Sequence, residues 1–337
     1  MKKERIAYVD LFRACGILLM IMGHVGFGGL FDKWIHGFHI PMFFFASGWF
    51  YKKGDSFSEF CRRKGKSILV PYLALGAAEL LCLLPFVEEY RNPRILYCWL
   101  LENTASVPAR CGSLHVSPVP GALWFLTALF FCEIFYRTAD RFLGLTWKLH
   151  LGIALAALFG MSAGMLLPFR LWWALDTALT GMSFYHLARC LKHGCFRKIT
   201  DLKLWEALTA GIFFSASILF SPPCNMRTAS YGLAPLFWIN AAGLTMAGWN
   251  LARCLEPYLA AGALTRRLSG WLERVGKNSI VYLCLNQIVI LAVNNLTDLS
   301  GLTGLAARGV ILLLSLVILT VLEKLICGTK LKILIGR

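Results

Sequence analysis

The most informative pattern in the chain lies in residues 8–51, YVDLFRACGILLMIMGHVGFGGLFDKWIHGFHIPMFFFASGWFY, where a membrane-length apolar segment carries Asp10, Arg13 and His24. An arginine and a histidine inside such a segment are energetically costly, so by default they mark a functional site. Arg13 and His24 are eleven residues apart. In a helix this spacing puts them about 20° apart around the axis and roughly 16 Å apart along it. Asp10, one turn before Arg13, shares the same face.

A simpler interpretation has Arg13 extending to lipid headgroups and His24 serving as a packing residue. The functional interpretation is favoured because the two costly residues share one face and are followed by His36 and His39, which open a second apolar run. Pro41, just inside that run, permits a break in the helix. We therefore expect the polar start of the second segment to line a cavity.

The composition is that of a polytopic membrane protein. Hydrophobic residues make up 58% of the chain and charged residues 15%, and the mean hydropathy is +0.63. A soluble domain has about 25% charged residues. The net charge of +16 does not indicate nucleic-acid binding, because the lysines and arginines cluster in alternate loops, as the positive-inside rule predicts. We expect a lipid bilayer and no nucleic acid as partner.

The apolar windows predict an all-α fold of about ten transmembrane helices. They cover residues 9–30, 35–51, 67–87, 121–138, 149–168, 171–190, 204–220, 231–251, 278–296 and 304–326. Most of the 34 lysines and arginines fall in loops on one side, so both termini are predicted to be cytoplasmic. The chain shows no internal repeat, and residues 1–337 are expected to form a single transmembrane domain.

Two of the predicted loops are long. Outer residues 88–120 are expected to form a lid or an acceptor-binding element, with a plain extracytoplasmic connector as the alternative. Inner residues 252–277 have the pattern of an amphipathic helix at the membrane surface, for which a simple lipid anchor is the favoured interpretation.

The Asp-x-x-Arg and Arg-x10-His spacing, followed by FHIPMFFFASGWFY, resembles the acyltransferase 3 family of integral membrane O-acyltransferases. Three later stretches are similar to the same family: ALWFLTALFF at 122–131, LWWALDTALTGMSFY at 171–185 and VGKNSIVYLCLNQ at 275–287. The resemblance spans most of the chain, and the first segment is its specific part. The sequence departs from the family pattern at Asn286, where we expect a histidine.

The resemblance implies an O-acyltransferase of the cell inner (plasma) membrane. The usual donor is acetyl-CoA on the cytoplasmic side, and the usual acceptor is a hydroxyl of an extracytoplasmic glycan or glycolipid precursor. It also implies that the first-helix arginine and histidine are essential, and we carry those roles onto Arg13 and His24. An imidazole suits the general base, and a forked guanidinium suits the phosphates of the donor. We expect a donor tunnel along this helix face.

The remaining candidate residues are expected either to orient Arg13 or to bind the acceptor. Asp10 is expected to orient Arg13 by an ion pair, with a favourable charge at the helix N-terminus as the alternative. The residues predicted to contact the acceptor are His36, His39, Trp124 and Asp176. The alternatives are a waterside packing role for His39, an interfacial aromatic belt for Trp124 and an arginine partner for Asp176.

Three other interpretations were weighed against this one. His24, His36 and His39 are numerous enough to bind a metal, but nothing in their spacing requires it, so no metal is predicted. A transporter of a polar small molecule would also need buried polar residues, but transporters often have matching halves with broken helices. A sensor or scaffold with a degenerate site is the third alternative, because of Asn286. The sequence specifies no oligomeric state.

Overall fold

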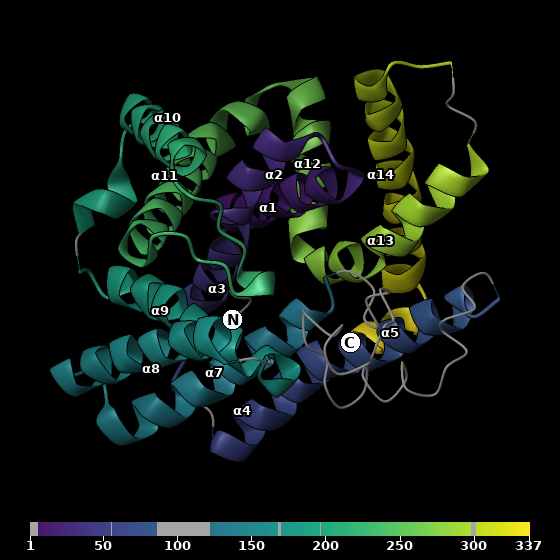
Figure 1. Cartoon of the computed structure of the whole chain (residues 1–337). Coiled ribbons are helices and arrows are strands. Elements are labelled where there is room, and N and C mark those ends of the chain that lie inside the picture. Colours follow the sequence, from purple (N-terminus) through teal and green to yellow (C-terminus); the bar gives the residue numbers. More distant parts are fainter. Residues whose placement is uncertain (1–5, 55, 86–121, 168–169, 196, 298–300) are drawn as a thin grey trace.

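The computed structural model describes residues 6–54, 56–85, 122–167, 170–195, 197–297 and 301–337 (Figure 1). Within these ranges the regular structure is helical throughout, apart from one isolated antiparallel bridge between Asn225 and Ser230. The predicted all-α class is therefore confirmed for the described residues. The outer loop 88–120, predicted as a lid or a connector, lies outside them.

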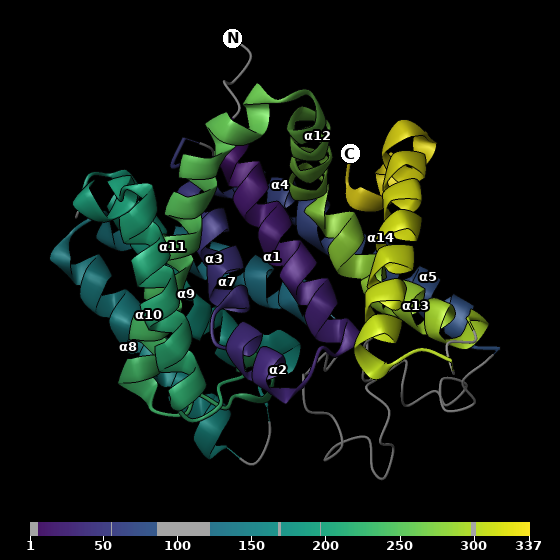
Figure 2. The same ribbon diagram turned by 90° about the horizontal axis from the view of Figure 1, so that it is seen from above.

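Helix α1, Ala7–Val25, lies at the centre of the molecule (Figures 1 and 2). Three helices from the second half of the chain pack around it: α11 (Ala234–Ala261), α12 (Ala263–Lys277) and α13 (Ser279–Leu296). Gly26 ends α1 with φ of 84°, a left-handed conformation that glycine adopts without strain. The helix that carries the predicted site is thus enclosed by its neighbours.

The predicted second apolar segment consists of two short helices, α2 (Gly29–His36) and α3 (His39–Trp49). Gly37 and Phe38 separate them, so His36 ends one helix and His39 begins the next. Pro41 does not break α3. It lies in the first helical turn, where its missing N–H would have had no partner in any case.

Helix α3 connects α1 to a second group of helices, α7 (Trp124–Leu143), α8 (Trp147–Leu166) and α9 (Leu175–Lys192). The closest approach is between Gly48 of α3 and α9. A Cβ atom at Gly48 would lie 2.2 Å from the carbonyl oxygen of Tyr185, so only glycine fits there. This contact fixes α3 between the two groups.

Helices α4 (Phe57–Lys64) and α5 (Val70–Leu83) form one continuous rod, joined by the π-helical turn Gly65–Leu69. Single π-helical turns occur frequently at functional sites. The other segments are α10 (Leu204–Phe220), α14 (Gly304–Gly328) and the 3-10 turns Trp172–Ala174, Arg197–Asp201, Met226–Thr228 and Lys330–Ile335.

Five helical segments among the described residues are long and apolar enough to cross a membrane: Ala7–Val25, Phe57–Leu83, Trp147–Leu166, Ser279–Leu296 and Gly304–Gly328. Helices also lie within each of the other predicted windows. The protein is thus an all-helical membrane protein with five candidate spans. The count of ten spans remains a prediction.

The inner segment 252–277 differs from its prediction as one surface helix. Helix α11 continues to Ala261, and α12 then packs along α1 instead of only covering lipid. A Cβ atom at Gly276 would lie 1.9 Å from the carbonyl oxygen of Asp10, so the two backbones touch. The amphipathic pattern of α12 therefore reflects its packing against α1.

Both described ends of the chain reach the junction of α12 and α13 (Figure 2). Asp10 lies against Gly276, while the Arg337 guanidinium donates to Asn278 Oδ1 at 2.6 Å and to the Lys277 carbonyl at 3.1 Å. The first turn of α1 and the C-terminal Arg337 therefore lie at the same junction. The even number of crossings and the cytoplasmic location of this side remain predictions.

Candidate active site

Two cavities follow one face of α1. The first, with a volume of about 330 Å³, is lined by Met20 and His24 of this helix, and the second, of about 290 Å³, by Arg13 and Ile17. These four positions recur every three or four residues, which is the period of a single helix face. We call the first the histidine cavity and the second the arginine cavity.

The histidine cavity brings together four of the predicted residues. His24 of α1, His36 of α2 and His39 of α3 line it with Trp124, the first residue of α7. Trp124 is buried, with 5% of its surface exposed, so its ring forms part of the cavity wall and not of an exposed aromatic belt. The consecutive helices α1, α2 and α3 thus meet α7 at one cavity.

His24 is held by Asn286 of α13, 262 residues away in sequence. The Asn286 amide nitrogen donates to the carbonyls of Tyr282 and Leu283, at 3.0 and 2.7 Å. Its oxygen therefore faces His24 Nδ1, at 2.5 Å, and accepts a hydrogen bond from the Nδ1–H. The neutral imidazole then carries its proton on Nδ1 and leaves Nε2 free to accept one.

The other two imidazoles are held in the same tautomer. His36 Nδ1 lies 2.6 Å from the carbonyl oxygen of Asp32, and His39 Nδ1 lies 2.7 Å from that of Ile35. A carbonyl only accepts, so Nδ1 is the protonated nitrogen in both rings. The two rings are nearly perpendicular, with centroids 5.3 Å apart. The cavity therefore has three imidazoles whose Nε2 atoms are proton acceptors.

A loop that the sequence analysis did not single out closes part of the histidine cavity. Asn225, Arg227 and Thr228, between α10 and α11, contribute to its lining. Burial lowers the pKa of the Arg227 guanidinium from its ordinary value, but a guanidinium remains protonated at physiological pH. The loop thus adds a cation to the cavity that His24, His36 and His39 line.

Asp176 holds this loop and lines neither cavity. Its carboxylate is fully buried and forms an ion pair with Arg170. The Arg170 guanidinium in turn donates to the Arg227 carbonyl at 2.6 Å and to Thr177 Oγ1 at 3.1 Å. Asp176 therefore has an arginine partner, the alternative considered for it, and through Arg170 it positions the Arg227 loop. Its contact with the acceptor remains a prediction.

The arginine cavity contains two cations and three serines. Arg13 and Lys64 line it together with Ser47, Ser67 and Ser279. Lys64 is the last residue of α4, directly before the π-helical turn, and in the sequence nothing distinguishes it from the other cations of the predicted inner loops. Lys64 Nζ pairs with the carboxylate of Glu133, also in the lining, at 2.7 Å.

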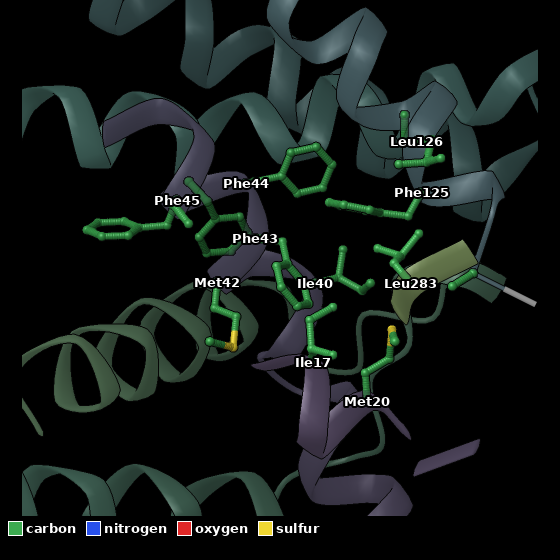
Figure 3. Close-up of a cluster of buried hydrophobic side chains, with 14 of the residues drawn as sticks. Ile17, Met20, Ile40, Met42, Phe43, Phe44, Phe45, Phe125, Leu126 and Leu283 are labelled. Atoms are coloured by element: carbon green, nitrogen blue, oxygen red, sulfur yellow. The ribbon is translucent and has the colours of Figure 1, made fainter. Parts of the chain in front are cut away.

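An apolar wall separates the cavities. Phe43, Phe125 and Leu283 line both of them, and the rings of Phe43 and Phe125 lie 5.8 Å apart between centroids (Figure 3). Both rings are buried, with 8% and 3% of their surfaces exposed. The expected tunnel along α1 is therefore two adjacent cavities with a shared wall.

Asp10 is not among the residues that line the two cavities. It is buried in the first turn of α1, and its backbone contacts α12 at Gly276. Its expected effect on Arg13 remains a prediction.

Within the described residues, the histidines of the first cavity do not form a compact cluster of metal ligands. The one such cluster there is His150, His186 and Cys190, which lies outside the lining of either cavity.

Comparison with known proteins identifies the family. A family model described as an acyltransferase domain, of the acyltransferase 3 type, matches residues 6–324. No curated protein and no solved structure matches the chain. The family match covers nearly the whole sequence, including every residue of both cavities. The chain therefore belongs to the acyltransferase 3 family and is a membrane acyltransferase.

Proposed function

We propose that this protein is an O-acyltransferase that transfers an acyl group, most simply acetyl, from cytoplasmic acyl-CoA to a hydroxyl of an extracytoplasmic glycan or glycolipid precursor. The observation that carries the proposal is the pairing of a cationic cavity and an imidazole cavity along one face of α1. The enzyme would work in the cell inner (plasma) membrane with both termini in the cytoplasm.

The donor is assigned to the arginine cavity because of its charge. Arg13 offers a forked guanidinium, which suits phosphate groups. Lys64 offers a compact ammonium that would exchange its Glu133 partner for phosphate when the donor binds. A volume of about 290 Å³ is at the lower limit for a small-molecule site. It would enclose only part of acyl-CoA, and the remainder would extend toward the cytoplasm. The thioester supplies an activated acyl group.

The acceptor hydroxyl is assigned to the histidine cavity, where His24 Nε2 would remove its proton. The hydroxyl oxygen then attacks the thioester carbonyl, an ester bond forms, the C–S bond breaks, and the CoA thiolate receives a proton. Asn286 would stabilise the imidazolium by keeping its oxygen on Nδ1–H, at the observed 2.5 Å. His36, His39 and Trp124 would contact the acceptor.

The apolar wall has a role in this scheme. The thioester must pass Phe43, Phe125 and Leu283 to reach His24, so at least one of these side chains moves during turnover. Between transfers the wall would keep water from the acyl donor and so limit its hydrolysis.

The proposal is tested by the ester-linked acetyl content of envelope glycans in a strain that lacks the gene. The strain is complemented with wild type, with His24→Ala or with His193→Ala, at matched membrane levels. His193 is an exposed histidine outside both cavities and serves as the control. Loss of a general base costs roughly 10²- to 10⁴-fold in rate, so His24→Ala should leave the esters absent while the other two restore them.

Two results would contradict the proposal in different ways. Full restoration by His24→Ala would show that His24 is structural and that the base is another residue. No difference between the deletion strain and the wild-type complement would show that the acyl group or the acceptor is wrong, and it would favour the transporter alternative.

A further inference from the structure

A second group of chemically reactive side chains lies between α8 and α9. His150 is in the first turn of α8, while His186 and Cys190 are one turn apart on α9. Residues four apart share a helix face, and α8 and α9 pack side by side (Figure 1). The three ligating atoms lie within 4.8 Å of one another.

The distances within this cluster are close to those of a metal site. His186 Nε2 lies 2.7 Å from His150 Nδ1 and 3.4 Å from Cys190 Sγ, and Sγ lies 3.9 Å from His150 Nδ1. Tetrahedral zinc needs about 3.4 Å between two nitrogens and about 3.6 Å between nitrogen and sulfur. The two rings would separate by about 0.7 Å, a small movement for the exposed His150 side chain.

Groups behind the cluster orient the buried histidine. The Tyr136 hydroxyl lies 2.7 Å from His186 Nδ1 and also accepts from Arg189 Nη1 at 3.3 Å. Arg189 in turn pairs with Asp140 at 2.6 Å. Metal-bound histidines almost always donate their second ring N–H to such a partner, which fixes the ring and the tautomer. His186 is therefore prepared to present Nε2 to an ion.

We propose that His150, His186 and Cys190 form a zinc-binding site that joins α8 to α9. Two imidazoles and one thiolate suit borderline-soft divalent ions such as Zn²⁺, and three protein ligands leave a fourth position for water. The site is separate from both cavities and does not depend on the proposed function. In the predicted orientation it faces the cytoplasm, where free thiols persist.

Zinc binding at this site releases one proton. With the Nδ1–H of His186 directed to the Tyr136 hydroxyl, the Nε2 of His186 accepts a hydrogen bond from the Nδ1–H of His150 in the metal-free protein. When zinc binds both nitrogens, His150 shifts its proton to Nε2, which can reach water. The Cys190 thiol loses its proton and binds as the thiolate, so affinity rises with pH.

Cobalt titration of the full-length, reduced protein in detergent tests the site. Co²⁺ bound to a thiolate gives a charge-transfer band in the near ultraviolet, and we expect one ion per chain that Zn²⁺ displaces. Cys190→Ser and His150→Ala should each weaken Co²⁺ binding by at least about tenfold, and Cys190→Ser should also remove the band. Cys61 is a partly exposed cysteine on α4, and Cys61→Ser is the matched control. This variant should keep the wild-type affinity for Co²⁺ and the charge-transfer band.

Thermal unfolding provides the second measurement and shows that the variants fold. Metal-free wild type, His150→Ala and Cys190→Ser should unfold at similar temperatures, and Zn²⁺ should stabilise only the wild type. Absence of the band in the wild type, or its persistence in Cys190→Ser, would overturn the proposal. Equal stabilisation of His150→Ala by Zn²⁺ would overturn it as well.

Discussion

At the scale of the residue, the contact between His24 and Asn286 defines the chemistry of the candidate site. An asparagine can orient an imidazole only if its oxygen faces the ring, and the two carbonyls that accept from its nitrogen ensure this. The departure from the family pattern therefore leaves His24 with an ordered tautomer. A degenerate site, as in a sensor or scaffold, would not need this arrangement.

Substitution of Asn286 tests the contact. Asn286→Leu leaves the Nδ1–H of His24 without an acceptor, which costs about 1–3 kcal/mol and should reduce acyl transfer about 10- to 100-fold. Asn286→Asp keeps an acceptor oxygen and should retain more activity. Transfer is measured as ester formation in membrane vesicles.

Asn295→Leu, an exposed position on the same helix, is the control for this experiment and should leave transfer unchanged. Equal activity of Asn286→Leu and wild type would show that the tautomer of His24 does not limit the reaction.

At the scale of the element, short irregular segments position some of the polar residues that line the cavities. Close backbone contacts fix how the helices pack. The π-helical turn Gly65–Leu69 follows Lys64 and contributes Ser67 and Ile68 to the arginine cavity. The Met226–Thr228 turn, held by Arg170, brings Arg227 to the histidine cavity. Helices thus carry most of the charged lining residues, and the Met226–Thr228 turn adds Arg227 to them.

The contact between α12 and α1 predicts a large difference between two glycines of one helix. A methyl group at Gly276 would collide with the Asp10 carbonyl, so Gly276→Ala should lower the free energy of unfolding by about 1–3 kcal/mol. Gly270 is exposed with no atom near its Cβ position, so Gly270→Ala should be neutral or stabilising by about 0.5–1 kcal/mol. Thermal unfolding of the purified variants measures both. Equal stability of the two would show that α12 does not pack closely on α1.

At the scale of the whole molecule, Asp10 of the first turn of α1 and the C-terminal Arg337 both lie at the α12–α13 junction. With the bias of lysine and arginine toward alternate loops, the positive-inside rule predicts that this junction faces the cytoplasm. A green fluorescent protein fused after Arg337 should therefore fluoresce, and alkaline phosphatase fused there should be inactive.

A phosphatase fused after Thr228, in the predicted outer loop, is the positive control for this topology and should be active. An active phosphatase at the C-terminus would reverse the orientation. It would also move the donor side of the proposed reaction to the other face of the membrane.

The amino-acid sequence alone predicts the all-helical membrane class and the face of α1 that carries Arg13 and His24. Both follow from local properties, hydropathy over one helix length and a period of 3.6 residues, which neighbouring residues encode. The sequence also singles out His36, His39 and Trp124, which line the histidine cavity, because each lies in an apolar segment where polarity or a family motif makes it conspicuous.

Which distant residues meet became visible only in the folded molecule. There His24 contacts Asn286, Asp176 pairs with Arg170, and Lys64 pairs with Glu133 in the cavity that Arg13 lines. Phe43, Phe125 and Leu283 divide the expected tunnel. The physical reason is that these contacts join helices through side-chain packing and hydrogen bonds across long sequence separations. A local pattern records that a residue is polar or apolar, but its partner is selected by how whole helices fit together.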